Sequence, residues 1–255
     1  ISLVGESNND LLGSSVSISY DGTRIAVGIM GEDDGGTDRG MIRIFDYNSG
    51  TDKWEQVGQD IKGDNNNDTI GYRVALNKSS DSSIDGSRFT FTTRHGGYVK
   101  VYEYNSGTSQ WDMMGSNSVW DSSNTTRGKF SISTNGSSIG FSSLNEDGSI
   151  VAIGNDDDNT VNTYKWDGSA NWTLIGQTLN ASNYSSSISA GDGFGSGGQL
   201  SAKGGYLVVG SRYVDVGGTD AGQVAVYYNP SLSPATGNYK LLGSVINDDS
   251  VSADL

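Results

Sequence analysis

The sequence predicts an all-β fold, a β-propeller built from four-stranded antiparallel blades, with about four blades plus one extra strand. Two observations predict it. A unit of short apolar runs and turns recurs at intervals of roughly 60 residues, which is the pattern of stacked blades. The composition includes 37 Gly and only 2 Pro, which suits many tight turns between short strands. A β-sandwich is the alternative, because short strands with regular turns also build that fold.

The clearest element of the unit is a turn followed by a short strand. An Asp-Gly or Gly-Gly pair is a hairpin signal, and the residues after it favour β-structure. The four copies are "DGTRIAVG" (21–28), "DGSRFTFT" (85–92), "DGSIVAIG" (147–154) and "KGGYLVVG" (203–210). A further short strand is expected before each turn, at "GSSVSIS", "GYRVALN", "GKFSIS" and "GQLS".

Two more strands follow each turn. The third is "MIRIFDY", "VKVYEY", "VNTYKW" or "QVAVYY", and in the first copy Ile42 and Ile44 share one face while Arg43 points to the other. The fourth begins at Trp54, Trp111, Trp172 or Tyr239. The near-identical "FDYNSGTDKW" and "YEYNSGTSQW" are then hairpins that join the third strand to the fourth.

These elements divide the chain into blades. We expect one propeller domain or propeller fragment over 1–255, with repeats at approximately 13–70, 71–127, 128–194 and 195–255. Because "ISLVG" aligns with "YKLLG" and "WEQVG", residues 1–12 are expected to hold the last strand of a preceding blade. Such a spare strand offers an edge for pairing with a neighbouring molecule.

Charge and composition restrict the partners. The formal net charge is −14, and such a chain repels nucleic acid and anionic membranes, so we expect neither as a partner. No run is long and apolar enough to span a bilayer, so no membrane insertion is expected. The absence of cysteine excludes a disulfide framework, thiol catalysis and a zinc-thiolate site.

The repeats resemble the secreted FG-GAP-like propeller repeats of integrin-α-type ectodomains. The resemblance is carried by "SVSISYDGTRIAVG", by the loops "GGTDRG" and "GGTDAG", and by "GDGFG" at 191–195. It covers nearly the whole chain with short motifs. It implies a propeller fold, an extracellular or cell-surface location, and adhesive or structural work without catalysis.

The calcium loop that this resemblance implies is largely missing. The pattern D-x-D-x-D-G-x-x-D keeps Asp21 in the first hairpin, and Asn145 with Asp147 in the third. Calcium needs six to eight oxygen ligands, so we expect no cofactor, with weak calcium binding as the alternative. Acidic clusters elsewhere are interpreted as solvated loops. The candidate ligands in them are Asp33, Asp34, Asp38, Asp156, Asp158, Asp215 and Asp220.

The residues of common catalytic sites are scarce. His95 is the only histidine, and a Ser-His-Asp triad would have to use it. It lies in a predicted hairpin loop, which favours a surface residue. The 30 acidic residues offer many carboxylate pairs, but no spacing selects one for glycoside hydrolysis. The sequence therefore predicts that the chain is not an enzyme.

Two kinds of residue suggest contact with glycans. Asn-x-Ser/Thr sequons are acceptor sites for N-glycosylation in secreted eukaryotic proteins. They begin at Asn67, Asn77, Asn124, Asn135, Asn171, Asn180 and Asn183. Trp54, Trp111 and Trp172 recur at one position, which favours packing between blades. Trp120 and Trp166 lie outside that position and are the candidates for stacking on a saccharide.

These observations lead to a functional hypothesis. We expect an extracellular structural or adhesive propeller module that is not an enzyme and that forms a subunit of a glycosylated surface filament. Its partners would be copies of itself or neighbouring propeller modules, and glycans. A carbohydrate-binding, lectin-like propeller is the alternative.

Overall fold

The computed structural model describes residues 3–115, 129–131, 139–180, 191–215, 218–232 and 237–247. All regular secondary structure in these ranges is β-strand, and the strands form four antiparallel sheets. The prediction of an all-β propeller with four-stranded antiparallel blades is confirmed. The described part of the chain holds no helix with the length and apolar character needed to cross a membrane.

The first sheet shows the plan that the others repeat. It contains β1 (Leu12–Ile18), β2 (Arg24–Ile29), β3 (Met41–Asn48), β4 (Lys53–Gln56) and β5 (Ile61–Lys62). The strand order is β1-β2-β3-β4, and β5 also pairs with β3. On β3, Phe45 pairs with Gln56 of β4 and Ile42 pairs with Ile61 of β5. Because β4 and β5 are two pieces of one outer strand, the sheet has four strand positions.

The other three sheets follow the same plan. The second contains β6 (Ile70–Leu76), β7 (Arg88–Thr93), β8 (Tyr98–Asn105), β9 (Gln110–Met113) and β10 (Lys129–Ser131). The third contains β11 (Ile139–Leu144), β12 (Ile150–Asn155), β13 (Thr160–Trp166), β14 (Trp172–Leu174) and β15 (Leu179–Asn180). The fourth contains β16 (Phe194–Leu200), β17 (Tyr206–Ser211), β18 (Gln223–Tyr228), β19 (Lys240–Leu241) and β20 (Ile246–Asn247).

The repeated Asn-Ser-Gly stretch is the hairpin between the third and outer strands, as predicted. Asn48 Oδ1 accepts hydrogen bonds from the Gly50 and Thr51 amides at 2.9 and 3.3 Å. Asn105 Oδ1 accepts the same bond from the Gly107 amide at 3.0 Å. A short amide side chain that caps its own turn in this way explains why the stretch recurs.

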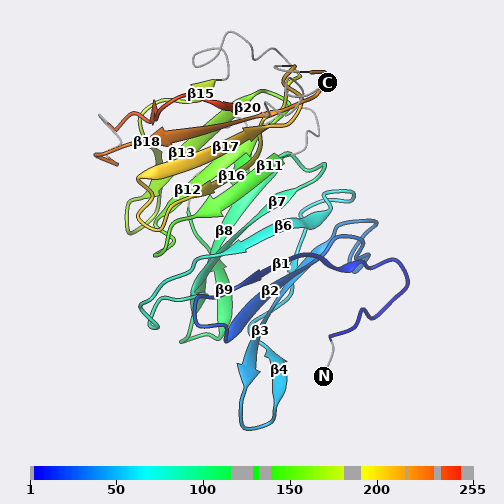
Figure 1. The fold of residues 1–255 in the computed structure, drawn as a ribbon. Helices are drawn as coiled ribbons and strands as arrows, with labels where there is room; N and C mark the ends of the chain where they lie inside the picture. The colour runs from blue at the N-terminus through cyan, green and yellow to red at the C-terminus, as the bar shows by residue number, and fades with distance from the viewer. Residues whose placement is uncertain are drawn as a thin grey trace, which may run out of the picture.

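The four sheets are arranged side by side along an arc (Figure 1). The innermost strands β1, β6, β11 and β16 contact one another in that order. The first sheet and the fourth sheet lie at opposite ends of the arc, near the two ends of the chain. Each inner sheet is therefore covered on both faces, whereas each end sheet has one face without a neighbouring sheet among the described residues.

The hydrophobic core is divided into three layers, one between each pair of neighbouring sheets. The first layer joins Ala26, Ile42 and Ile44 to Phe89 and Trp111. The second layer lies between the second and third sheets, and the third layer lies between the third and fourth. Alternation along each strand places one set of side chains toward the preceding sheet and the other toward the next sheet.

The predicted start of the third blade is wrong. Residues 129–131 of "GKFSIS" form β10, which pairs with Tyr98–Lys100 of β8 and completes the outer strand of the second sheet. The first strand of the third sheet is β11, which follows "GKFSIS" in the sequence. The third repeat therefore begins near Ile139 and not at residue 128. Both stretches are short and hold few β-formers among Ser, Gly and Lys, so local pattern does not distinguish an outer strand from an inner one.

The extra strand predicted at residues 1–12 is not present in the described residues. Residues 3–11 have no strand pairing. A strand needs a neighbouring strand for its backbone hydrogen bonds, and no described strand pairs with these residues. Residues 6–11 instead repeat the loop at 64–69 that leads into the second sheet. Asp10 accepts a hydrogen bond from the Ser7 amide at 2.6 Å, as Asp68 does from the Asn65 amide at 2.7 Å.

Candidate interaction surfaces at the ends of the arc

Every interface between sheets uses the same two surfaces. We call the face that packs on the preceding sheet the N-side face, and the face that packs on the following sheet the C-side face. In the second sheet the N-side face carries Val74, Leu76, Phe89 and Trp111. In the first sheet the C-side face carries Ala26, Ile42, Ile44 and Ile61. Cross-strand register identifies the residues of the other sheets that occupy the same positions.

The C-side face of the fourth sheet is apolar but has no neighbouring sheet in the described structure. Val224 pairs with Ile246 as Ile42 pairs with Ile61 and Val161 with Leu179. Ile246 is 60% exposed, whereas Ile61 is 4% and Leu179 is 1% exposed. Burying one such side chain completely contributes about 1.5–3 kcal/mol. The fourth sheet thus repeats the residue types of a buried interface on a surface that faces solvent.

The N-side face of the first sheet is the matching surface. Val16 and Ile18 occupy the positions of Val74 and Leu76, since each pair of residues faces equivalent residues of the second strand. Val16 is 69% exposed, whereas Val74 is 8% exposed. Ile18 is also exposed, and Leu76 is buried. The two ends of the arc therefore carry the two different halves of one repeated interface.

Tryptophans connect neighbouring sheets by hydrogen bonds. Trp111 Nε1 donates to the Val57 carbonyl of the first sheet at 2.9 Å, and Trp172 Nε1 donates to the Met114 carbonyl of the second at 3.3 Å. Trp54 occupies the same position in the first sheet but is only half-buried. The counterpart of Val57 and Met114 in the fourth sheet is Leu242, because the three amides bond equivalent carbonyls of the third strand. Leu242 is exposed.

Glycines mark the closest approach of the sheets at the first and third inner interfaces, whereas Thr92 stands at the equivalent position of the second sheet. A Cβ atom on Gly28 would lie 2.2 Å from the Gly71 carbonyl oxygen, and a Cβ on Gly154 would lie 2.4 Å from the Gly195 carbonyl oxygen. Only glycine allows this contact. Gly210 stands at the Gly28 position of the fourth sheet. The nearest atom to its Cβ position belongs to its own sheet, at 3.7 Å.

The opposite end has the complementary glycine. Gly13 takes the position of Gly71 and Gly195, one residue after the first paired residue of its sheet. A Cβ on Gly71 would lie 3.0 Å from Gly28 Cα, but no described atom lies within 4 Å of the Cβ position of Gly13. The positions for close backbone contact are therefore present at both ends of the arc.

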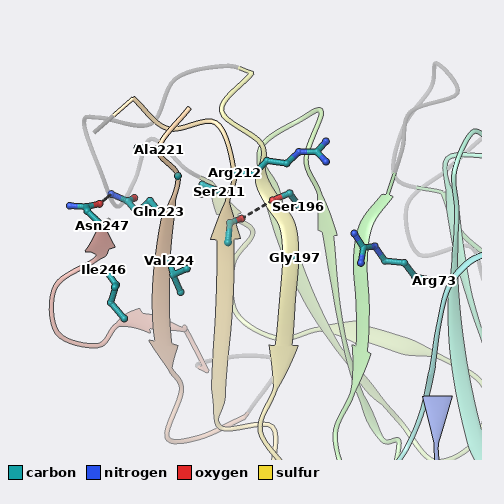
Figure 2. A pocket seen from close by; sticks show the side chains of 12 residues that line it. Arg73, Ser196, Gly197, Ser211, Arg212, Ala221, Gln223, Val224, Ile246 and Asn247 are labelled. Atoms are coloured by element: carbon teal, nitrogen blue, oxygen red, sulfur yellow. Dashed lines mark hydrogen bonds between the residues drawn. The ribbon is translucent and has the colours of Figure 1, made fainter. Parts of the chain in front are cut away.

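A cavity of about 580 Å³ lies on the C-side face of the fourth sheet (Figure 2). Gly210, Val224 and Ile246 line it on the fourth sheet, and Arg73 of β6 in the second sheet also lines it. The three residues of the fourth sheet stand at positions that the next sheet covers at the first inner interface. Gln223 Nε2 donates to Asn247 Oδ1 at 2.9 Å at one side of the cavity.

Charged groups stand at the rim of this cavity. Arg212 lines it and pairs through Nη2 with Asp156 Oδ2 at 2.8 Å. Burial raises the pKa of Asp156, and the positive charge of Arg212 acts in the opposite direction. Asp156 is thus held within the fold by Arg212, and it is not directed toward the other predicted cation ligands.

The repeated loops "GGTDRG" and "GGTDAG" use their carboxylates to close the loop. Asp33 Oδ1 accepts a hydrogen bond from the Asp38 amide at 2.7 Å, and Asp215 Oδ1 accepts one from the Asp220 amide at 2.9 Å. Asp38 and Asp220 adopt left-handed φ values of 47° and 54°, which short polar residues tolerate. The structure brings together these two pairs of predicted ligands.

The remaining predicted cation ligands bind protein groups. Asp34 pairs with Lys62 at 2.6 Å, and Asp158 accepts a hydrogen bond from Asn155 Nδ2 at 2.7 Å. Within the described residues, no three His, Cys, Asp or Glu side chains gather closely enough to hold a metal ion. His95 is exposed in the turn between β7 and β8, where a surface residue was expected.

The structure separates the predicted glycosylation sites. Asn67 is exposed, and Asn171 and Asn180 are half-buried. Asn77 is fully buried, and its Nδ2 donates to the Ile84 and Glu146 carbonyls at 2.7 and 2.9 Å. Because a glycan would be attached at that nitrogen, Asn77 is removed from the predicted sites. Asn124, Asn135 and Asn183 lie outside the described residues.

Trp166, a candidate for saccharide stacking, is half-buried and lies 5.3 Å from Trp172 between ring centroids. Tyr47 with Trp54, and Tyr104 with Trp111, form the same pair at 5.5 and 5.1 Å. Trp166 is therefore part of a repeated aromatic pair that the sequence reasoning missed. The available signal was an aromatic residue seven positions before Trp54 and Trp111 and six positions before Trp172. Trp120 lies outside the described residues.

Comparison with known proteins supports the fold. No protein-family model and no curated protein matches the chain. A solved protein from Lactobacillus plantarum is 14% identical with a TM-score of 0.55. The aligned region covers 89% of this chain and 53% of that protein. The β-propeller domain of Cps50 (Swd1) from Myceliophteria thermophila is 12% identical with a TM-score of 0.54, and 90% of this chain covers 57% of it. The chain thus spans about half the length of these structures.

The same comparison corrects the prediction that the chain is not an enzyme. The periplasmic gluconolactonase PpgL from Pseudomonas aeruginosa is among the similar structures, at 13% identity and a TM-score of 0.48, with 91% of this chain covering 71% of it. Likeness at this level assigns neither a reaction nor a substrate to this chain.

Proposed function

We propose that the chain is an extracellular structural or adhesive propeller module that contributes its blades to a larger assembly at the cell surface. The observation that carries the proposal is the pair of exposed apolar faces at the ends of the arc. Val16 and Ile18 at one end, and Val224 and Ile246 at the other, occupy positions that are buried between inner sheets. Exposed apolar side chains at positions that are otherwise buried in the same fold indicate an interaction site.

The surface charge is compatible with such a role. The chain has a formal net charge of −14, which keeps subunits soluble until apolar faces meet. The exposed sequon at Asn67 provides a place where a glycan does not disturb packing. These features support the assembly hypothesis.

The experiment is electron microscopy of the native material, combined with cell fractionation and intact mass on the same sample. We expect regular assemblies in the surface fraction and a subunit mass above the 26.8 kDa of the polypeptide. Single particles at the bare polypeptide mass, found in the cell interior, would overturn the proposal. The assemblies should be seen before any detergent or denaturant is added.

A further inference from the structure

We propose that the C-side face of the fourth sheet binds the N-side face of the first sheet of a second copy of this chain. The proposal rests on the assembly role proposed above and names the partner. At each inner interface a C-side face packs on an N-side face, and among the described residues the first and fourth sheets leave one of each. A head-to-tail contact between copies would repeat an interface that the chain already makes three times.

The apolar residues of the two faces match in position. At the first inner interface, Ile42 and Ile61 pack in one layer with Val74 and Leu76. Between copies, Val224 and Ile246 would replace the first pair, and Val16 and Ile18 would replace the second. All four are large apolar residues that are at least partly exposed in the single chain.

The backbone contact also has both of its halves. Gly28 and Gly71 are forced to be glycine by their close approach across the first interface. Gly210 and Gly13 stand at the same two positions. No described atom lies within 4 Å of the Cβ position of Gly13, and the nearest atom to that of Gly210 is the Gly197 carbonyl oxygen at 3.7 Å. The φ of Gly13, at +90°, gives that residue a local reason to be glycine. Neither the φ of Gly210 nor a close contact in the single chain requires glycine at that position, and the approach of a second backbone would require it.

The cavity on the fourth sheet is the seat for this contact. It is lined by Gly210, Val224 and Ile246, the counterparts of Gly28, Ile42 and Ile61. At the first interface those residues are covered by β6, the innermost strand of the second sheet. The innermost strand of a second copy is β1, so Gly13 would enter the cavity.

A second copy is favoured over closure of the chain on itself. The first and fourth sheets stand at opposite ends of the arc (Figure 1). The chain also spans 53% and 57% of the two similar solved structures with the higher TM-scores, so two copies approach the length of such a protein. A head-to-tail contact either closes a ring of two copies or continues as an open row.

The test uses the full chain in sedimentation velocity over a dilution series. The wild-type chain should sediment as a multiple of 26.8 kDa and dissociate on dilution. Because each copy carries a net charge of −14, added salt should strengthen the association. A wild-type chain that remains monomeric at every concentration and salt level overturns the proposal. The same result is expected if another protein occupies the two faces.

Two variants test the two faces separately. Gly210→Ala has room in the single chain, and in the complex its methyl group should meet a carbonyl, weakening association by about 10-fold or more. Val16→Asp places a charge on the opposite face at an exposed position. Both should keep the circular dichroism and melting temperature of the monomer. Gly205→Ala, whose nearest atom would lie 3.5 Å away, is the matched control and should associate like wild type.

Mixing the variants tests the head-to-tail geometry. Gly210→Ala keeps an intact N-side face and Val16→Asp keeps an intact C-side face, so a mixture should form a one-to-one dimer although each variant alone is monomeric. The mixture is measured at a concentration where the wild-type chain associates and each variant alone is monomeric. A mixture that stays monomeric there, or a Val16→Asp chain that still self-associates there, refutes the proposed contact. A monomeric chain found at the cell surface would contradict only this inference. Copies that assemble inside the cell would contradict only the proposed function.

Discussion

Substitution of Gly28 by alanine tests whether packing between sheets depends on backbone contact. The added Cβ would lie 2.2 Å from the Gly71 carbonyl oxygen and 2.5 Å from Ser15 Oγ. Ser15 Oγ donates to that same carbonyl at 2.7 Å. Relief of the overlap requires the two sheets to separate along β1 and β6, because neither backbone can turn away as a flexible side chain would.

The expected magnitude follows from two opposing effects. Overpacking a tight interface costs about 1–3 kcal/mol, and alanine offsets about 0.4–1 kcal/mol of this by restricting the unfolded chain. The net loss of unfolding free energy is therefore about 1–2 kcal/mol. For a chain of this size each kcal/mol corresponds to about 2–4 °C, so the melting temperature should fall by about 2–8 °C.

The assay is thermal unfolding followed by circular dichroism, at a protein concentration where the chain is monomeric. Gly205→Ala serves as control, because its Cβ would make an ordinary contact at 3.5 Å and should leave the melting temperature unchanged or slightly raised. If Gly28→Ala melts at or above the wild-type temperature, the close approach of the sheets does not constrain this position and the reasoning fails.

The remaining predictions concern burial, charge and modification. Trp111→Ala should lower the free energy of unfolding, measured by denaturant titration, by about 3–5 kcal/mol. Trp54→Ala should lower it clearly less, because only Trp111 packs against a preceding sheet. Equal losses for the two variants would contradict this. The pKa of Asp21 lies below its usual 3.8 because the Thr23 amide and the Ser19 hydroxyl donate hydrogen bonds to the carboxylate. The ionised Asp21 therefore stabilises the folded chain above pH 3.8, and this stabilisation is lost as the pH falls through the folded-state pKa. Asp21→Asn should flatten that acid limb in pH-dependent melting, and an unchanged limb would refute the assignment. Peptide mass spectrometry of protein secreted from a eukaryotic host should find glycan at Asn67 and none at Asn77, and an occupied Asn77 in folded protein would contradict its burial.

Much of the fold could be predicted because the strand signals are local. The Asp-Gly turns, the period-two alternation and the recurring tryptophans each depend on neighbours in the sequence. The misplaced start of the third blade shows the limit. Residues 129–131 and the strand at Ile139–Leu144 are both short with few β-formers, and only hydrogen bonding to β8 or to β12 distinguishes them.

The candidate surfaces could not be predicted from residue type. Val16 and Val74 are the same amino acid at the same position of the repeat, and they differ only in whether a sheet stands in front of them. In the same way, the sequence around Asn77 does not indicate that this sequon is buried. Its side-chain amide donates to the carbonyls of residues 84 and 146, and the second of these belongs to the next sheet. Exposure depends on which sheets are neighbours, and that is a property of the assembled arc.

The layered arrangement of the core has a consequence for the number of blades that such a chain can carry. Each sheet brings one face of each kind, so an array of any length ends in the same two surfaces. Duplication of a whole blade adds one buried layer and leaves the ends unchanged, and deletion removes one layer. Because stability then grows with each internal layer while the cost of the two ends stays constant, blade number can change without the invention of a new contact.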